Sequence, residues 1–420
     1  MESKQEAGFL GALTSWVEKT MAPGVVKFTE NPYVSAIRAG FLATIPVMII
    51  GSVFLIIWLF PIPAWEKIVA PFAPKLMVMV NYTFGILGLI CSYTIAYNLA
   101  KNLDMEPVAP GIFSLLSFLI LSPPVKDSIP LGFLGGTGLF SSIVLAIATV
   151  SVLRLLYRYR ITIKMPKGVP PAITEVFTSI VPGLVYLAIV WLVRVVLNID
   201  VNTIILNALK PLVVAGDSLI ALNTEVFINR LAWFVGIHGY TVVQSIAMPF
   251  WTMALAENAK AAAAGLPIPH IGTSMFLDGL ALWSGSVTWP VIGILLFSRL
   301  KSFRALGRLN APIGFFMIWE PIMFGLPIIL NPMMFIPFLL SGIWGVTFAW
   351  FMVRLGFVTA PYIMIPMITP PIIGGYLTTG GDWRAIPVTI IVLVGAAIIW
   401  YPFIKAWERI RAQENPSDIM

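Results

Sequence analysis

The chain has 420 residues, of which 59% are hydrophobic and only 11% are charged, and its net charge is +7. An ordinary soluble domain has roughly 25% charged residues and could not bury this much apolar surface. The composition therefore excludes a soluble globule and predicts a protein whose solvent is the lipid bilayer. The positive charge does not indicate a nucleic-acid partner, because the basic residues cluster beside hydrophobic runs, where they fit membrane topology better.

The sequence offers no motif for metal, cofactor or redox chemistry. Its single cysteine, Cys91, lies in an apolar run, which excludes an intramolecular disulfide and a cysteine-based metal site. Neither a glycine-rich phosphate loop nor a His-Glu-x-x-His signature occurs. We therefore expect no cofactor, no metal and no ATP-driven step in this chain.

Several segments in the first half are suited to cross a bilayer, which takes about 20 mostly apolar residues. Proline, glycine or polar clusters separate them, and the third is short. The predicted spans are Val34–Phe60, Leu76–Leu99, Val108–Leu121, Gly138–Leu156 and Thr174–Leu197. Residues 1–33, before the first span, form a charged amphipathic segment without the pattern of a cleaved signal peptide.

Basic residues next to the spans predict the topology. The stretch from Arg154 to Lys167 holds five basic residues and no acidic one, which assigns it to the cytoplasm. Counting back four crossings places the N-terminus on the same side. Arg409 and Arg411 place the tail, residues 409–420, there too. Both termini are therefore expected to be cytoplasmic.

A polar interruption divides the chain into two membrane halves. From Asp200 to Asp217 polar and apolar residues alternate around Pro211, so we interpret residues 200–218 as an amphipathic connector lying at the membrane interface. It separates an N-terminal half, residues 34–199, from a C-terminal half, residues 219–408.

The C-terminal half is harder to divide into helices. It begins with a predicted span, Leu219–Val235, but reads as irregular from Glu257 to Pro290, and residues 299–308 read as a second basic cytoplasmic loop. Five prolines between Pro312 and Pro337 are too frequent for one unbroken helix. Broken backbone at membrane depth is tolerated only where it is buried in protein or lines a wet cavity, so we expect re-entrant segments here. Two ordinary spans, Ile336–Val353 and Ala385–Phe403, follow.

Glu320 is the strongest candidate for a functional side chain. It lies in an apolar segment directly before Pro321, without a neighbour in the sequence that could neutralise it, and a carboxyl group at membrane depth is costly. It can accept a hydrogen bond or a proton from a ligand hydroxyl. The alternative is a structural carboxylate bonded to free amides at a helix end. The cost of burial favours the functional interpretation.

Other polar residues in apolar surroundings are weaker candidates. His238 lies between Gly236 and Gly239, and a ligand contact and a helix-capping role are equally plausible for it. His270 reads as a loop residue. Four further charged residues are adequately explained by ion pairs between helices or by snorkelling to the interface. They are Glu225, Arg230, Asp278 and Arg354.

Four groups of residues, in this order and spacing, make a specific pattern. They are Asn31-Pro32 with Ala36 to Phe41, Pro46 and Gly51; Lys167 to Pro171 with Phe177 and Pro182; Trp233 to Gly239; and Glu320 to Pro327 with Asn331-Pro332. Together they resemble the membrane component, enzyme IIC, of the lactose/cellobiose/diacetylchitobiose family of bacterial sugar phosphotransferase systems. The resemblance runs nearly from end to end.

This resemblance implies an all-α polytopic fold of the bacterial inner membrane, with about ten transmembrane helices, two re-entrant hairpins and an amphipathic connector. The N-terminal half would form a homodimer and the C-terminal half would bind the sugar. Such permeases translocate a sugar, here a β-linked disaccharide or β-glucoside. A cytoplasmic IIB protein, phosphorylated on cysteine and working with a IIA protein, then phosphorylates the sugar 6-hydroxyl. Cys91 lies within a span, so this chain is not the phosphoryl carrier, and whether it counts as an enzyme by itself is left open.

The resemblance also implies site residues. Glu320 and His238 match the residues that hold the 6-hydroxyl, with Glu320 as the base, while Asn258 and the Gly239 backbone are weaker matches. Trp319 is expected to contact the substrate, because aromatic faces stack on pyranose rings.

The chain departs from the family pattern at two places. Where Asn-Ile-Asn-Glu-Pro is usual, it has Met317-Ile318-Trp319-Glu320-Pro321, and where Gly-Gly-Ser-Gly is usual it has Leu282-Trp283-Ser284-Gly285. Two amides that donate and accept hydrogen bonds are thus replaced by apolar or aromatic bulk. These changes predict a different ligand, such as an aryl glucoside or a smaller sugar. They also leave open an alternative function as a non-phosphorylating carrier or receptor of the same fold.

Overall fold

The fold was analysed in a computed structural model of the chain. It describes residues 27–59, 63–122 and 131–419, except Thr29, Lys167, Val235, Ile237, Ser284, Pro327 and Leu330. Most of the predicted N-terminal segment, residues 1–33, and Lys167 of the first basic stretch lie outside the described residues. Within the described ranges every regular element is helical, and the one β-bridge, between Leu300 and Ile419, is isolated.

The helices of the N-terminal half follow the predicted spans closely. The first predicted span is α3 and α4 joined by a short turn, and Val108–Leu121 forms α8 with the predicted bounds. The elements are α3 (Pro32–Leu42), α4 (Ile45–Leu59), α5 (Pro63–Val69), α6 (Ala73–Asn81), α7 (Leu87–Asn102), α8 (Val108–Leu121), α9 (Leu131–Leu134), α10 (Leu139–Arg158) and α11 (Pro171–Trp191). Gly40 lets α3 approach α7, because a Cβ atom at this position would overlap Ile95.

The second half contains more helix than the sequence predicted. The elements are α12 (Val201–Gly216), α13 (Leu219–Phe234), α14 (Gly239–Ala263), α15 (Gly285–Leu296), α16 (Lys301–Phe315), α17 (Glu320–Gly325), α18 (Pro332–Arg354), α19 (Pro371–Thr378) and α20 (Ala385–Glu414). Two sequence predictions were wrong. The irregular region does not begin at Glu257, because α14 continues to Ala263, and the second basic loop, residues 299–308, is mostly the start of the amphipathic helix α16.

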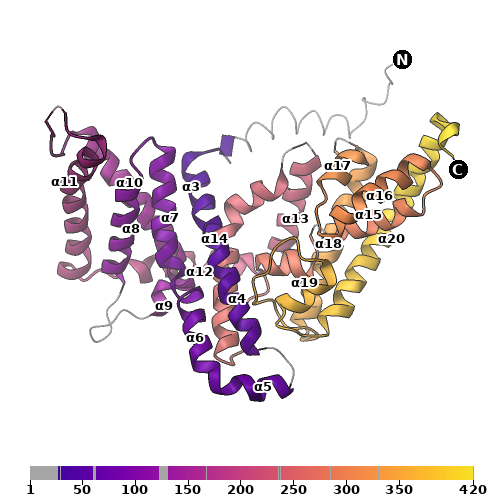
Figure 1. The fold of residues 1–420 in the computed structure, drawn as a ribbon, viewed down its shortest axis with the longest axis horizontal. Coiled ribbons are helices and arrows are strands. Elements are labelled where there is room, and N and C mark those ends of the chain that lie inside the picture. The colour runs from indigo at the N-terminus through magenta and orange to yellow at the C-terminus, as the bar shows by residue number, and fades with distance from the viewer. Residues whose placement is uncertain are drawn as a thin grey trace.

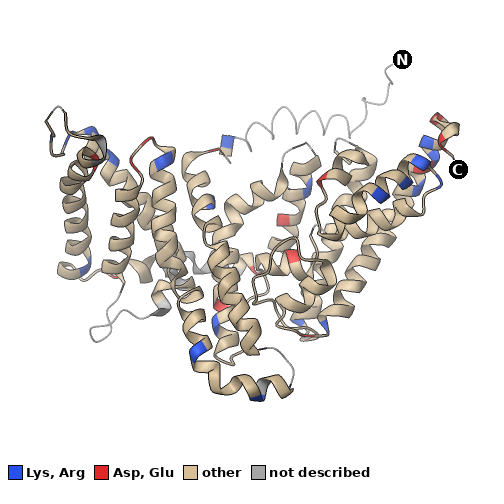
Figure 2. Cartoon of the chain, in the orientation of Figure 1, with Lys and Arg blue, Asp and Glu red and all other residues tan. Residues whose placement is uncertain are grey.

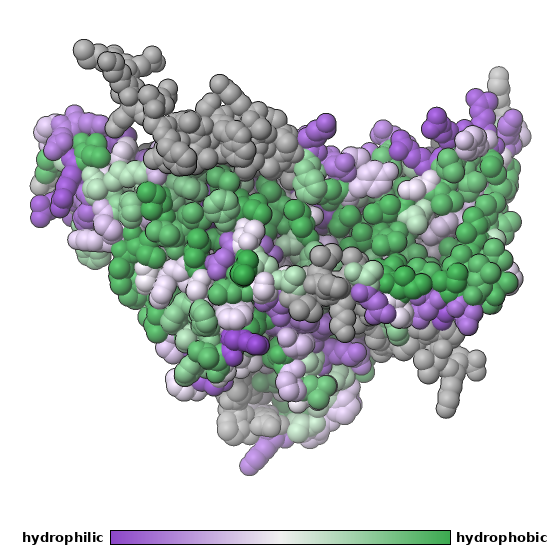
Figure 3. Space-filling model, turned by 180° about the vertical axis from the view of Figure 1, so that it is seen from behind, coloured by the Kyte–Doolittle hydropathy of each residue, from purple (hydrophilic) through white to green (hydrophobic). Residues whose placement is uncertain are grey.

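Charge and hydropathy are distributed as a membrane protein requires. Seven helical stretches of the described chain are long and apolar enough to cross a bilayer, and α8 is a shorter apolar helix. Figure 2 shows charged residues mainly toward the ends of the helices, with a few in the middle of the molecule, and a broad apolar belt crosses the molecule in Figure 3. The predicted count of about ten helices and the two re-entrant hairpins stay predictions.

The helices form two groups with α14 between them (Figure 1). Helices α7, α8, α10 and α11 lie in one group, and α15, α16, α18 and α20 lie in the other. Helix α14 contacts α3 as well as α13. The start of α3 and the end of α20 lie at the same edge of the molecule in this view.

Helix α12 covers most of residues 200–218, the segment predicted as a connector, and is hydrogen-bonded to elements before and after it in the sequence. At its start, the Asn202 amide donates to the carbonyl oxygen of Leu121, at the end of α8, over 3.1 Å. At its end, Asp217 Oδ1 accepts from the backbone N–H of Ile271 at 2.8 Å and from that of Gly272.

The predicted tail continues the last helix before it folds back. Helix α20 runs past residue 408 to Glu414, and the Asp418 carboxylate accepts from the backbone N–H of Ser302 at 3.0 Å. Ser417 and Asp418, beyond α20, therefore dock on the start of α16.

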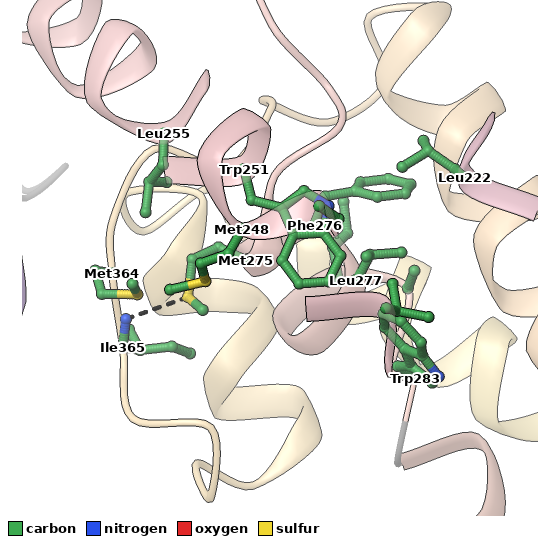
Figure 4. Packing of buried hydrophobic residues seen from close by; sticks show 14 of the residues in the cluster. Leu222, Met248, Trp251, Leu255, Met275, Phe276, Leu277, Trp283, Met364 and Ile365 are labelled. Carbon is green, nitrogen blue, oxygen red and sulfur yellow. Dashed lines mark hydrogen bonds between the residues drawn. The ribbon is translucent and has the colours of Figure 1, made fainter. Parts of the chain in front are cut away.

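One apolar cluster extends from α3 to α20 and includes the region where α13, α14 and the segment from Met275 to Trp283 meet. Figure 4 shows Leu222, Trp251 and Phe276 packed in this part of the cluster. The backbone N–H of Ile365 donates to Met275 Sδ at 3.3 Å, which joins a distant loop to the same cluster.

Candidate functional site

His238 stands at the start of α14, where the backbone turns sharply after Gly236, whose φ is +81°. Its Nδ1 accepts a hydrogen bond from the Thr241 backbone N–H at 3.4 Å, and the Thr241 hydroxyl lies 3.2 Å away. A neutral ring that accepts at Nδ1 carries its proton on Nε2. Helix capping, one of the two sequence interpretations, therefore engages Nδ1 and leaves Nε2 free to face a ligand.

Glu320 is the first residue of α17 and faces His238. The distance between His238 Nε2 and Glu320 Oε1 is 4.0 Å, and the two side chains are 52% and 40% exposed. Glu320 has no charged neighbour in the sequence, as the sequence analysis noted, and the side chain that faces it comes from a different helix far along the chain. The pair lies open to incoming molecules, and its gap is wider than a direct hydrogen bond.

Gly239 is required by the close packing of α14 on α13. A Cβ atom at Gly239 would overlap the carbonyl oxygen of Asn229 and would lie 2.8 Å from Trp233 Cδ1. Any larger residue would push the first turn of α14, and His238 with it, away from α13. Gly239 therefore belongs to the site through its backbone.

Two tryptophans form the wall behind the pair. The Trp233 ring lies 4.6 Å from the His238 ring, and the Trp319 ring lies edge-on to Trp233 with centroids 5.6 Å apart. Both indoles are buried. The structure thus brings His238, Gly239, Trp319 and Glu320 together.

Asn258 lies elsewhere. It is on the same helix as His238 but 20 residues later, which is about 30 Å along an α-helix. Its amide is fully used: Nδ2 donates to the carbonyl oxygens of His270 and Pro361, each at 2.8 Å, and Oδ1 accepts from the His270 backbone N–H at 3.0 Å. Asn258 supports the loop that carries His270.

His270 lies in a loop, as predicted, and is held between two carboxylates. Its Nε2 is 2.7 Å from Glu257 Oε2, and its Nδ1 is 3.5 Å from Asp217 Oδ2. Burial disfavours the charged ring, but hydrogen bonds and attraction to both carboxylates outweigh burial and raise the pKa of His270 to about 9. The ring is therefore charged at neutral pH and joins the end of α12 to α14. No group of three or more His, Cys, Asp or Glu residues suited to a metal occurs in the part of the chain described.

Arg230 is the residue that sequence reasoning undervalued. It is completely buried, and its guanidinium lies between two rings, 4.6 Å from the centroid of Trp319 and 4.3 Å from that of Phe338. Its Nη2 donates to the Trp283 carbonyl oxygen at 2.5 Å and to Ser286 Oγ at 3.2 Å. The sequence did contain a signal for this residue, because a charged side chain lies three positions before Trp233 in an apolar helix. The sequence analysis explained that charge by an ion pair between helices or by snorkelling to the interface.

The two departures from the family pattern coincide with strained backbone. Leu282 has a φ of 56° and Met317 a φ of 63°, in the left-handed region that glycine and asparagine adopt more readily than leucine and methionine. The two turns meet at Gly285, where a Cβ atom would lie 3.1 Å from Leu282 Cβ and 3.5 Å from Met317 Cε. The chain therefore has left-handed turns of the kind that glycine and asparagine favour, but the larger residues Leu282 and Met317 occupy them.

Comparison with known proteins identifies the family. Residues 38–342 match the phosphotransferase system EIIC family. The chain belongs to this EIIC family. It is 32% identical to the cellobiose-specific EIIC component of a phosphotransferase system from Geobacillus stearothermophilus, over 96% of both chains. It is also 32% identical to the lactose-specific EIICB component from Staphylococcus epidermidis, over 95% of this chain and 71% of that longer one.

A solved structure extends the match to the fold of this EIIC protein. The crystal structure of ChbC, the IIC component of the N,N'-diacetylchitobiose-specific phosphotransferase system, matches with a TM-score of 0.88 and 31% identity, covering 95% of this chain and 99% of that one. The predicted family and all-helical membrane fold are confirmed. The chain is a multi-pass EIIC sugar permease component.

Proposed function

We propose that this EIIC protein carries a β-glucoside or β-linked disaccharide across the membrane and presents its 6-hydroxyl between His238 and Glu320 for phosphorylation. The observation that carries the proposal is the 4.0 Å separation of His238 Nε2 and Glu320 Oε1. One hydroxyl oxygen can lie about 2.8 Å from each of two atoms this far apart. It would accept from the Nε2 proton and donate to the carboxylate.

The chemistry follows from this arrangement. As the sugar oxygen forms its bond to phosphorus, the bond between phosphorus and the cysteine sulfur of the IIB protein breaks, and the hydroxyl proton passes to Glu320. His238, positioned by Thr241, orients the oxygen. Trp233 and Trp319 form a buried wall on one side of the pair.

The proposed class of sugar follows from the names of the relatives and from the two places where the chain differs from the family pattern. Relatives are named for cellobiose, lactose and N,N'-diacetylchitobiose, so we assign a β-linked sugar. Trp319 and Trp283 bring aromatic bulk where the family pattern has smaller or amide residues, which favours a β-glucoside with an aryl group. Asn258 is assigned a supporting role, because its hydrogen-bonding atoms are occupied by the backbone of His270 and Pro361.

Partners and orientation are part of the proposal. The lactose relative is named EIICB, which indicates that a IIB part works beside the EIIC part, and here IIB and IIA would be separate cytoplasmic proteins. Both termini would be cytoplasmic, consistent with the start of α3 and the end of α20 lying at one edge of the molecule (Figure 1). Residues 34–199 would form the interface of a homodimer, with residues 219–408 as the half that moves the sugar.

The test replaces Glu320 with glutamine in full-length protein reconstituted in vesicles with phosphorylated IIB. We expect phosphorylation to fall by about a hundredfold or more, the usual scale for loss of a general base, while folding is unchanged. Glu175→Gln, an exposed glutamate on α11, is the matched control. Full phosphorylation by the Glu320 variant would contradict the site. Sugar transport by the wild type without any phosphorylation would support the non-phosphorylating carrier instead.

A further inference from the structure

A buried cation without a counter-ion lies behind the proposed sugar site. Arg230 is 0% exposed, yet its Nε and Nη1 have no hydrogen-bond partner. None of the ion pairs between described residues includes it. Burying an unpaired charge is expensive, and buried polar atoms are normally satisfied. The Nη2 bonds and the sandwich between Trp319 and Phe338 explain how Arg230 is held but not what its other two N–H groups bind.

Two indole donors in contact with the surroundings of Arg230 also lack a partner. They are the N–H groups of Trp233 and Trp283, whereas the unpaired acceptors among the described residues include Asn229 Oδ1 and one carboxylate oxygen each of Glu225 and Asp278. Trp233 contacts Trp319, which contacts Arg230, and the Trp283 carbonyl oxygen accepts from Arg230. The free N–H groups of the charged Arg230, with these two indoles, are suited to a ligand group that only accepts hydrogen bonds and is negative. A carboxylate meets both requirements and can bind a guanidinium through two oxygens.

The position of Arg230 relative to His238 and Glu320 limits the shape of a ligand that could reach all three. Trp319 directly precedes Glu320, and its ring separates Arg230 from Trp233 and His238. A glycoside with its 6-hydroxyl at the pair and its other end across Trp319 would therefore reach Arg230. Trp283 and Trp319 are also the two tryptophans at the departures from the family pattern. Both follow closely on left-handed, non-glycine backbone, at Leu282 and Met317, and such strain is often found where function requires it.

We propose that Arg230 forms an inner subsite that binds a carboxylate on the aglycone, so that the preferred substrate is an acidic β-glucoside. This inference rests on the proposed function, because the same glucoside must place its 6-hydroxyl between His238 and Glu320. The aglycone carboxylate accepts charge-assisted hydrogen bonds from the free Nε–H and Nη1–H groups of Arg230. The ring of Trp319 swings aside as the aglycone enters.

The experiment compares two glucosides of nearly the same shape. 4-Carboxyphenyl and 4-nitrophenyl β-D-glucoside both keep the 6-hydroxyl, but only the first is anionic at neutral pH. Binding to the purified full-length protein is measured by titration calorimetry. We expect the carboxylate to bind at least about tenfold more tightly than the nitro compound, as charge-assisted hydrogen bonds imply.

Variants identify the group responsible for the preference. Arg230→Gln should bring the two affinities together, Arg230→Lys should keep part of the difference, and Arg354→Gln, at the exposed end of α18, should change nothing. Equal affinities in the wild type, or a preference that survives Arg230→Gln, would overturn the subsite. Should the glutamine variant not fold, the wild-type comparison and the lysine variant decide.

The same titrations separate the subsite from the proposed function. If the sugar site is correct, Glu320→Gln weakens both glucosides by a similar factor. Binding of both compounds without preference, and with this dependence on Glu320, overturns the subsite alone. Binding of neither compound, or binding that does not depend on Glu320, contradicts the proposed function itself.

Discussion

Replacing His270 with glutamine removes a cation held between Asp217 and Glu257. Burial opposes the charged ring, but the hydrogen bonds and attraction to both carboxylates raise the pKa of His270 from 6.5 to about 9. Because the folded-state pKa lies above the unfolded value, the stabilisation is complete below pH 6.5 and is lost as the pH rises through about 9. His270 therefore stabilises the protein most in acidic and neutral solution.

The size of the effect follows from the two pKa values. A rise from 6.5 to about 9 corresponds to about 3 kcal/mol, at about 1.4 kcal/mol for each pH unit. Glutamine can keep neutral hydrogen bonds but supplies no charge, so Asp217 and Glu257 are left facing each other without a cation. We expect His270→Gln to unfold at a temperature several degrees lower than the wild type at pH 6, with the difference nearly gone at pH 10.

The assay is thermal unfolding of detergent-solubilised protein between pH 6 and pH 10, followed by the fluorescence of its 14 tryptophans. The chain has only two histidines, so His238→Gln, which removes a helix-capping ring but leaves His270 in place, is the matched control and should keep the loss of stability that His270 causes between pH 6 and pH 10. A difference between wild type and His270→Gln that stays constant from pH 6 to pH 10 would refute the assignment of a charged, paired ring.

Two further predictions concern loops away from the His238–Glu320 pair. Asn258→Ala removes three buried hydrogen bonds and should lower the free energy of unfolding by roughly 2–4 kcal/mol. Asn102→Ala, which removes one exposed bond to Pro32, should cost less than about 1 kcal/mol, and similar losses in both variants would contradict this account. Gly380 and Gly356 both have positive φ, +73° and +76°, but a Cβ atom would overlap the Tyr362 hydroxyl only at Gly380. In thermal unfolding Gly356→Ala should cost about 1–2 kcal/mol and Gly380→Ala clearly more, whereas equal losses would show that the overlap is relieved at no cost.

The N-terminal half was largely predictable because its helices face lipid. A continuous apolar run bounded by breakers leaves few alternatives in a bilayer, and Val108–Leu121 formed a helix with the predicted bounds. The alternating polarity between Asp200 and Asp217 was interpreted as an amphipathic segment, and a helix forms there, while its position at the membrane interface stays a prediction. Helix α12 occupies Val201–Gly216.

The second half was less predictable, because its polar residues are satisfied by tertiary contacts that hydropathy does not record. The Ala-rich stretch after Glu257 favours helix strongly, and Asn258 finds its partners in two distant loops, so α14 continues through it. The basic residues from Lys301 to Arg308 lie on an amphipathic helix rather than in a loop. Their charge indicated a membrane edge but not the backbone conformation.

The residue types of the candidate site were predictable from the sequence, but the packing of the residues behind the His238–Glu320 pair was not. Glu320 was proposed from the cost of burying a carboxyl group, and both Glu320 and His238 from the resemblance to the enzyme IIC family. The structure places them 4.0 Å apart. Arg230 was read as an ordinary ion-pair residue, because the sequence does not show that Trp319 and Phe338 enclose it. Long-range packing of this kind is the part that a single sequence leaves out.

The central claim is that Glu320 holds the sugar 6-hydroxyl, and binding of a glucoside is compared with binding of its 6-deoxy analogue to test it. In wild-type protein the 6-deoxy compound should bind at least about tenfold more weakly, because the polar groups of the pair lose their partner. In Glu320→Gln the two compounds should bind with much more similar affinity. The same ratio of affinities in both proteins would contradict the claim.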